Sequence, residues 1–402
     1  MRILKATFLA IISSYFVVLF TISSVYAATE DALQFSGFAR VVLGYLDESN
    51  ATYSGYSDDI SLSQQSLIGL QVDYQLADNL SITSQLIGRS GNERGSGVEW
   101  LYLTYQPTRS IQIKLGKQRT PFFNYSDSID VGFAYPWVTL PKQVYNSSLI
   151  STFNGALANY QWSGKKFGFD VEAYWGSFDD MTFISAVAIP ANVNDLRGLI
   201  TKLNYDNWII RASYHTADIF IKLPKLEEFS SLLSRFGFTQ SAQSLSLDGK
   251  VEFYQLAASY ENINYFFRTE VTKIHTQSPT IPDVSRFYVA AGYHYYSFLS
   301  YVSFAKDKST NGAPVNEIPI GFGPQLDALA LGYQRVFNTL LVSNSQSITV
   351  GTKWNFKSNL ALKAEVTWIE ADQGGDTSFY VLDETKFDKK APLYQLALEW
   401  VF

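Results

Sequence analysis

The sequence predicts an all-β fold, a transmembrane antiparallel β-barrel of about 16 strands, and three features carry that prediction. The last segment, 392–402, alternates apolar with polar residues and ends on Phe402. The first residues have the form of an export signal. Aromatic residues make up 16% of the chain, yet its mean hydropathy is only -0.03. Barrels combine these properties because lipid-facing and lumen-facing residues alternate along each strand.

The final predicted strand has one apolar and one polar face. The polar face carries Gln395, Ala397 and Glu399, and the apolar face carries Tyr394, Leu396, Leu398, Trp400 and Phe402. Terminal residues of soluble proteins usually fray into water. Aromatic residues instead gather where barrel strands cross the membrane surface. We therefore expect Trp400 and Phe402 to be membrane anchors.

The N-terminal segment predicts export. Arg2 and Lys5 precede an apolar run, 8–22, and the small residues around Ala27 form a cleavage site. A transmembrane helix is the alternative for this run. No later stretch reaches the roughly 20 apolar residues that a helical span needs. We expect a signal peptide at 1–27 and a single β-barrel domain at 28–402, because no linker divides the chain.

Composition excludes several classes of function. The chain has no cysteine, which removes disulfides, thiolate metal sites and cysteine nucleophiles. Its net charge is -6, and loss of Arg2 and Lys5 with the signal makes it more acidic by two charges. An acidic chain argues against a nucleic-acid partner. None of His215, His275 and His294 lies in a nucleophile or metal motif, so we expect no catalytic residue, no metal and no cofactor.

Period-two alternation predicts the strands in order. They lie near 34–46, 62–76, 80–89, 98–106, 110–119, 150–162, 166–176, 195–205, 208–217, 250–260, 263–274, 286–296, 299–306, 347–356, 360–370 and 392–402. Two segments, 226–236 and 326–337, fit helical spacing instead and are assigned to helices inside long loops. A strand at 326–337 would make the total odd, whereas bacterial barrels have an even number.

The connections alternate between short and long. Tight turns are predicted at 77–79, 107–110, 163–165, 206–207, 261–262 and 357–359, where Asn, Asp, Ser and Gly cluster. Long links lie near 47–61, 90–97, 120–149, 177–194, 218–249, 275–285, 307–346 and 371–391. Short periplasmic turns and long outer loops are the usual asymmetry of such barrels.

These features resemble the trimeric, sixteen-stranded superfamily of Gram-negative outer-membrane porins. The resemblance rests on the first strand, 36–45, the segment 113–119 that enters a long third loop, the rhythm of strands and turns, and the terminal Phe402. It implies passive diffusion of small hydrophilic solutes across the cell outer membrane. It also implies a homotrimer, contact with outer-membrane lipid and lipopolysaccharide, and a C-terminal strand read by the barrel-assembly machinery.

The same resemblance implies that the third loop, about 120–149, folds inward and narrows the pore. The expected constriction residues are Asp127, Asp130, Tyr135, Trp137 and Lys142. Charged residues in lumen register on the wall are Arg40, Lys114, Arg211, Arg268, Glu270, Lys353, Lys363 and Glu365. The alternative is that each is an ordinary solvated lumen residue. The loop lacks the acidic Pro-Glu-Phe-Gly-Gly pattern of enterobacterial general porins.

A general diffusion porin with a weak cation preference is the expected function. Asp127 and Asp130 would act across a gap narrower than the Debye length, about 8 Å at physiological salt, so salt would screen them poorly. Two alternatives stay open. A substrate-selective channel for sugars or small organic acids would use the third-loop aromatics. A structural or adhesin barrel would depend on its outer loops. Enzymatic activity is not expected, since no catalytic constellation is present.

Overall fold

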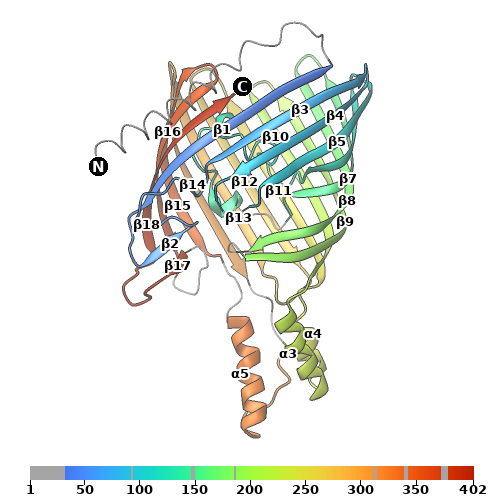
Figure 1. The fold of residues 1–402 in the computed structure, drawn as a ribbon, viewed down its shortest axis with the longest axis vertical. Coiled ribbons are helices and arrows are strands. Elements are labelled where there is room, and N and C mark those ends of the chain that lie inside the picture. Colours follow the sequence, from blue (N-terminus) through green and yellow to red (C-terminus); the bar gives the residue numbers. More distant parts are fainter. Residues whose placement is uncertain are drawn as a thin grey trace, which may run out of the picture.

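The computed structural model describes residues 32–91, 94–145, 150–184, 187–310, 312, 315–338, 343–372 and 379–402. The expected signal peptide, 1–27, lies outside these residues. Sixteen antiparallel strands form one closed barrel, in which each strand pairs with the next along the chain and the last pairs with the first (Figure 1). The predicted fold class and the even number of strands are confirmed.

The barrel strands have the following bounds: β1 Leu33–Leu46, β3 Leu67–Ala77, β4 Leu80–Arg89, β5 Gly97–Thr108, β6 Ile111–Arg119, β7 Thr152–Ser163, β8 Phe167–Ile184, β9 Val187–Tyr205, β10 Trp208–Ile221, β11 Gly249–Glu261, β12 Tyr265–Thr276, β13 Asp283–Tyr295, β14 Phe298–Thr310, β15 Ser345–Lys357, β16 Leu360–Ala371 and β18 Lys390–Val401. Short turns join them at one end of the barrel, here called the turn end. Long loops join them at the other, the loop end. Asp206 and Tyr296 lie in two-residue turns and take positive φ values of 52° and 53°, as tight hairpins require.

Two predicted boundaries were wrong. β3 begins at Leu67 rather than near 62, and the expected loop at 177–194 is mostly strand, since β8 and β9 continue pairing to Ile184 and Val187. Phe178 and Val193 are paired in this extension, and both are buried in the main apolar cluster of the lumen. Pairing and burial therefore extend the hairpin through a segment whose alternation is broken by a bulge after Gly176.

Alternation places apolar side chains on the outer wall and polar ones inside. Along β14, exposed and buried residues alternate almost without interruption. Exposed aromatic residues gather near the turn end, among them Tyr74, Tyr105, Trp162, Tyr205, Trp208, Tyr265, Tyr293, Phe298, Trp354 and Phe402, and a second set lies toward the loop end, Tyr214, Tyr254, Trp368 and Tyr394. Two aromatic belts separated by an apolar band match the two surfaces of a membrane.

The seam between β1 and β18 includes the C-terminal residue. The backbone N–H groups of Gly37 and Phe402 each donate to the carbonyl of the other, at 2.8 and 3.0 Å. The Phe402 ring lies over Gly37 so closely that a Cβ on Gly37 would meet ring carbons at 2.4 Å. Trp400 packs beside it, with the two ring centroids 4.5 Å apart. The terminal aromatic pair thus covers the end of the seam.

The loop end carries the helices (Figure 1). α3 spans Pro224–Arg235, α4 spans Thr239–Gln243 and α5 spans Pro324–Asn338, so both predicted loop helices are confirmed. Leu233, Leu329 and Tyr333 share one buried cluster that joins the two loops. The Glu317 carboxylate accepts hydrogen bonds from the first backbone N–H groups of α4. None of the described helices is both long and apolar enough to span a membrane.

Two smaller features complete the chain. β2, Ala51–Tyr53, and β17, Phe379–Val381, form a separate two-stranded sheet that links the first and last loops beside the seam. Tyr53 packs on Phe379 with ring centroids 5.2 Å apart. Within the third loop lie a 3-10 turn η2, Gly132–Ala134, and a short helix α2, Lys142–Tyr145.

Candidate functional site

The third loop runs inside the barrel and packs against its far wall. Trp137 is completely buried, and its indole N–H donates to Ser303 Oγ on β14 at 3.1 Å. Its ring meets those of Tyr288 and Tyr301 edge-on, with centroids 5.7 and 5.8 Å away. These aromatic contacts give the lumen an apolar core that fixes the centre of the loop on the wall of β13 and β14.

Charged wall residues hold the middle of the loop by its backbone. The Lys363 ammonium donates to the carbonyls of Gly132 and Trp137, at 2.6 and 2.7 Å. The Lys353 ammonium donates to the Phe133 carbonyl at 2.6 Å, and the Glu365 carboxylate accepts from the Val138 N–H at 2.7 Å. A buried loop needs partners for its polar backbone, and ionised groups are the strongest available.

The two ends of the loop are held in the same way. The Arg211 guanidinium on β10 donates to the carbonyls of Pro121 and Phe122. The Glu270 carboxylate on β12 accepts hydrogen bonds from the Asn124 N–H at 2.9 Å and from the Tyr145 hydroxyl. Both wall side chains are almost completely buried. The structure therefore places five of the eight expected lumen-wall charges beneath the loop rather than at an open channel.

The other three wall residues are partly exposed. Arg40 donates to the Gln65 carbonyl at 2.8 Å and to the Tyr135 hydroxyl at 3.1 Å. Lys114 lies over the Tyr102 ring, 5.1 Å from its centroid. Arg268 pairs with Glu261 at 2.6 Å and stacks on Phe266.

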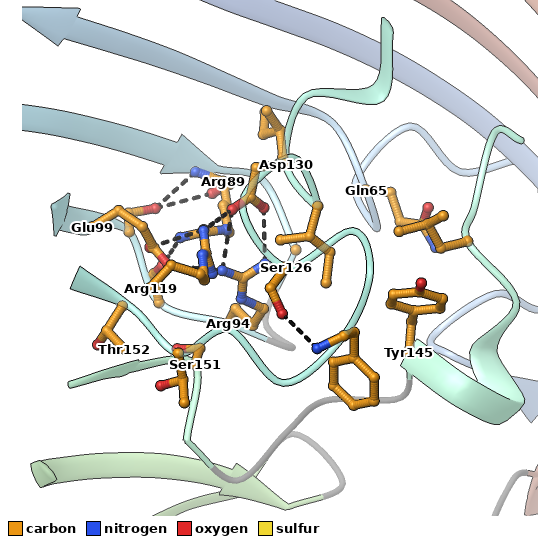
Figure 2. Close-up of a pocket in the computed structure, with 18 of the residues that line it drawn as sticks. Gln65, Arg89, Arg94, Glu99, Arg119, Ser126, Asp130, Tyr145, Ser151 and Thr152 are labelled. Atoms are coloured by element: carbon orange, nitrogen blue, oxygen red, sulfur yellow. Dashed lines mark hydrogen bonds and ion pairs between the residues drawn. The ribbon is translucent and has the colours of Figure 1, made fainter. Parts of the chain in front are cut away.

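The two loop carboxylates have different surroundings. Asp127 is exposed. Asp130 is buried and accepts from three guanidiniums, those of Arg89 at 3.0 Å, Arg94 at 2.8 Å and Arg119 at 2.5 Å (Figure 2). Burial disfavours its ionised form, but the three arginines outweigh burial and hold the pKa of Asp130 well below its usual range.

Glu99 on β5 completes this group, which is called the arginine cluster below: Arg89, Arg94, Glu99, Arg119 and Asp130. Glu99 pairs with all three arginines at 2.6–3.0 Å. In the sequence, Arg119 stood out only as part of the segment that enters the loop, and Arg89, Arg94 and Glu99 were not predicted as site residues. The only sequence signal was the closeness of three of these residues to strand ends that face the third loop.

The remaining expected constriction residues lie on either side of this cluster. Tyr135 is buried and its hydroxyl donates to the Ile129 carbonyl at 2.9 Å. Burial raises the pKa of Tyr135, and of Tyr125 to about 12, so both phenols stay neutral. Lys142 is partly exposed at the start of α2. Of the five, Asp127 is exposed and Lys142 is partly exposed, whereas Asp130, Tyr135 and Trp137 are held in packed surroundings.

Two cavities lie along the wall formed by β3 to β6. The outer cavity, about 410 Å³, is at the loop end and is lined by residues of the arginine cluster together with Arg40, Lys117 and Lys142. The inner cavity, about 230 Å³, is at the turn end and is lined by amides and hydroxyls with Asp78 and Lys114. Both cavities therefore lie on the wall opposite the aromatic anchor of the third loop.

His215 is the one histidine inside the packed lumen among the described residues. Its ring nitrogens lie 2.8 Å from Tyr174 Oη and from Ser213 Oγ. The ring is nearly completely buried against Phe122 and does not line either cavity. In the described part of the chain, no group of three acidic or histidine side chains is placed to hold a metal.

A closed sixteen-stranded barrel with an inward third loop is a porin-like fold, and solved structures share it. OmpT of Vibrio cholerae lacking its loop L8 is 13% identical, with 92% of this chain and 100% of that chain covered and a TM-score of 0.56. OmpF of Salmonella typhi in complex with daunomycin is 12% identical, with 92% of this chain and 97% of that chain covered and a TM-score of 0.56. An anion-selective porin of Comamonas acidovorans is 12% identical, with 93% of this chain and 100% of that chain covered and a TM-score of 0.53.

These comparisons confirm the predicted resemblance at the level of the fold. No protein-family model and no curated relative matches the chain. The chain has the fold of the sixteen-stranded porins.

Proposed function

We propose that this protein is a non-enzymatic channel of the Gram-negative outer membrane, through which small hydrophilic solutes and ions diffuse passively. The observation that carries the proposal is the third loop, which is fixed inside the lumen by aromatic packing and by five charged wall residues. A loop held this firmly narrows the lumen without filling it, and cavities with charged and polar lining groups remain at both ends of the opposite wall.

We further propose a weak cation preference that depends on Asp127. Its carboxylate is exposed on the loop, and Glu172 on β8 lies close enough for the two to interact electrostatically. Asp130 lies among three arginines with Glu99, so this cluster as a whole carries excess positive charge and does not favour cations. The basic residues of the outer cavity oppose the preference, which is why we expect it to be weak.

Replacing Asp127 with Asn should shift the reversal potential in a salt gradient toward anions without affecting folding. The carboxylate is exposed, so no buried partner is left behind. Most of the shift should vanish near 1 M salt, where the Debye length is about 3 Å. Planar-bilayer recording measures both effects, together with the conductance that tests the channel itself.

Asp206→Asn is the matched control, because it removes the same charge from a tight turn whose left-handed backbone suits asparagine. It should leave the reversal potential nearly unchanged. An unchanged potential for the Asp127 variant at low salt would remove this carboxylate from the permeation path. A protein that inserts but never conducts would overturn the channel proposal as a whole.

Orientation follows from the two ends of the barrel. We propose that the loop end faces the outside of the cell and the turn end faces the periplasm. An impermeant thiol reagent added to intact cells should label Ser231→Cys on α3 but not Lys357→Cys at the last short turn, both of which are exposed positions. Labelling of the Lys357 variant alone would reverse the orientation.

We also propose export by the signal peptide 1–27, a single barrel domain at 28–402, and a homotrimer embedded in outer-membrane lipid and lipopolysaccharide, with the C-terminal strand read by the barrel-assembly machinery. The trimer is supported by a similar structure of Vibrio cholerae OmpT described as a trimer form. Gly37 is covered by Phe402, so it does not provide the close approach between walls that a small outward residue would allow.

Two alternatives have some support. The outer cavity favours a channel selective for organic acids, and the joined helices α3 to α5 favour a structural or adhesin role for the loop end. A sugar channel has less support, because Phe122, Phe123 and Trp137 pack against the wall instead of forming an exposed row.

A further inference from the structure

We propose that the outer cavity is a binding site for a small organic anion, a carboxylate attached to an apolar body. The proposal rests on the channel function above, because it names a solute class that would pause at the loop end before passing the third loop. It does not follow from the fold, and the inner cavity on the same wall lacks the features that support it.

Charge is the first argument. Within the arginine cluster three guanidiniums face two carboxylates, so one positive charge is uncompensated. Arg40 and Lys117 add two more basic groups to the lining, and Asp180 is the one further acid among the described lining residues. The described lining therefore carries a net positive charge in a partly enclosed space, where screening by salt is weaker than at an open surface.

Unused hydrogen-bond donors are the second argument. Arg89 Nε, Arg119 Nε and Thr120 Oγ1 are buried without a hydrogen-bond partner. All three residues line the outer cavity. Buried polar atoms are nearly always paired, so three unpaired atoms on residues that line one cavity leave hydrogen-bonding capacity there for a bound acceptor. A carboxylate is the simplest acceptor that also neutralises the excess charge, since guanidinium groups bind carboxylates through paired N–H bonds.

Access is the third argument. The Arg94 side chain keeps 24% of its surface exposed, against 8% for Arg89 and 5% for Arg119. Arg94 is therefore the guanidinium that an anion meets first. Its partners Glu99 and Asp130 already bind the other two arginines, so rotation of Arg94 toward an incoming carboxylate would not leave either acid unpaired.

The apolar part of the lining limits the class of anion. Phe123, Leu140, Phe178 and Met181 line the same cavity as the basic groups. An inorganic anion would use only the charged side, whereas an organic acid would also cover this apolar side and gain from its burial. The inner cavity offers amides and hydroxyls with one Asp and one Lys, so it has neither the net charge nor the apolar side.

Calorimetric titration of the detergent-purified protein with benzoate tests the site directly and does not depend on conduction. We expect saturable binding that Arg94→Gln weakens about ten-fold or more, the loss expected for one charge-assisted contact. Lys117→Gln should weaken it as well. Lys202→Gln removes the same charge from the lumen face of β9, outside the cavity lining, and should leave binding unchanged.

Benzamide matches benzoate in size but lacks the charge, and inorganic phosphate has charge without an apolar body. Both should bind much more weakly. Equal binding of benzamide would overturn the role of charge, and equal binding of phosphate would overturn the organic class. No benzoate binding to a protein that conducts in bilayers would reject the site and leave the channel standing. Benzoate binding by a protein that does not conduct would support the site and reject the channel.

Sidedness adds a second measurement. In bilayers of known insertion, benzoate added at the loop end should reduce the current at lower concentration than benzoate added at the turn end. Arg94→Gln should abolish this difference. Equal block from both sides in the unmodified protein would place the site elsewhere in the lumen and contradict the proposal.

Discussion

Lys363→Met is expected to free the centre of the third loop and to give a channel with larger and noisier conductance. The lysine side chain is completely buried on β16, and its ammonium serves two loop carbonyls and lies 3.4 Å from the Glu399 carboxylate. Methionine keeps the length of the side chain but leaves Glu399 as an unpaired buried charge. Breaking a buried pair in this way costs about 3–5 kcal/mol.

The third loop can move away and let water reach the unpaired Glu399 carboxylate, whereas the strands are held in place by their ladders of hydrogen bonds. Single-channel recording should therefore show substates or a raised mean conductance, and hydrogen exchange should be faster at residues 132–138. Lys114→Met serves as control, since Lys114 lines the inner cavity, where its ammonium lies over the ring of Tyr102 on β5. Conductance and noise equal to those of the unmodified channel would show that Lys363 does not hold the loop.

Asp130→Asn should be the most damaging substitution on the loop itself. It leaves three guanidiniums, two of them buried, with Glu99 as the carboxylate of the cluster, so two positive charges are uncompensated. We expect a loss of stability of about 3–5 kcal/mol and a shift of the reversal potential toward anions that exceeds the shift for Asp127→Asn. Urea unfolding in detergent measures the first effect, and planar-bilayer recording measures the second.

A second substitution tests the cause. Arg119→Gln added to Asp130→Asn removes one of the unpaired charges and should recover part of the lost stability. A double variant less stable than Asp130→Asn alone would mean that packing, and not charge balance, determines the effect.

The depressed pKa of Asp130 gives this contact a defined response to acid. A carboxyl group whose pKa is lower in the folded state stabilises that state at every pH above its unfolded pKa, here near 3.8. The contribution is lost only as the pH falls through the much lower folded value. Exchange protection of residues 126–131 should therefore persist at about pH 3, and Asp130→Asn should reduce it at neutral pH as well.

The wall of the barrel could be predicted from the sequence because its physics is local. Lipid on one side and water or the loop on the other impose period-two alternation, which any strand such as β14 shows in its residues. The helix α5 could be separated from a strand by its spacing and by the even number of strands. The extension of β8 and β9 could not, because it depends on pairing between the two strands across a bulge.

The site was harder to predict because it depends on depth inside the lumen. Alternation placed Lys363, Glu365 and Glu270 correctly on the inner face of the wall. It could not show that the loop would cover them, since nothing local distinguishes a residue that faces water from one that faces a folded-in loop. The arginine cluster was missed for a related reason: its members come from β4, β5, β6 and two loops, and only the closed barrel brings them together.

The contacts between the last strands and the third loop affect the order in which the molecule can be assembled. Lys363 and Glu365 lie on β16 and Glu399 on β18, so the anchors of a loop made early in the chain arrive only near its end. Gly132 leaves room for the Glu399 carboxylate, which would collide with any Cβ there. The loop can therefore be anchored only once the last strands are in place, and we expect it to lie within the curved, still open sheet when β18 reaches β1. Docking of the terminal strand then completes the ladder, removes the two exposed edges and encloses the loop in a single late event.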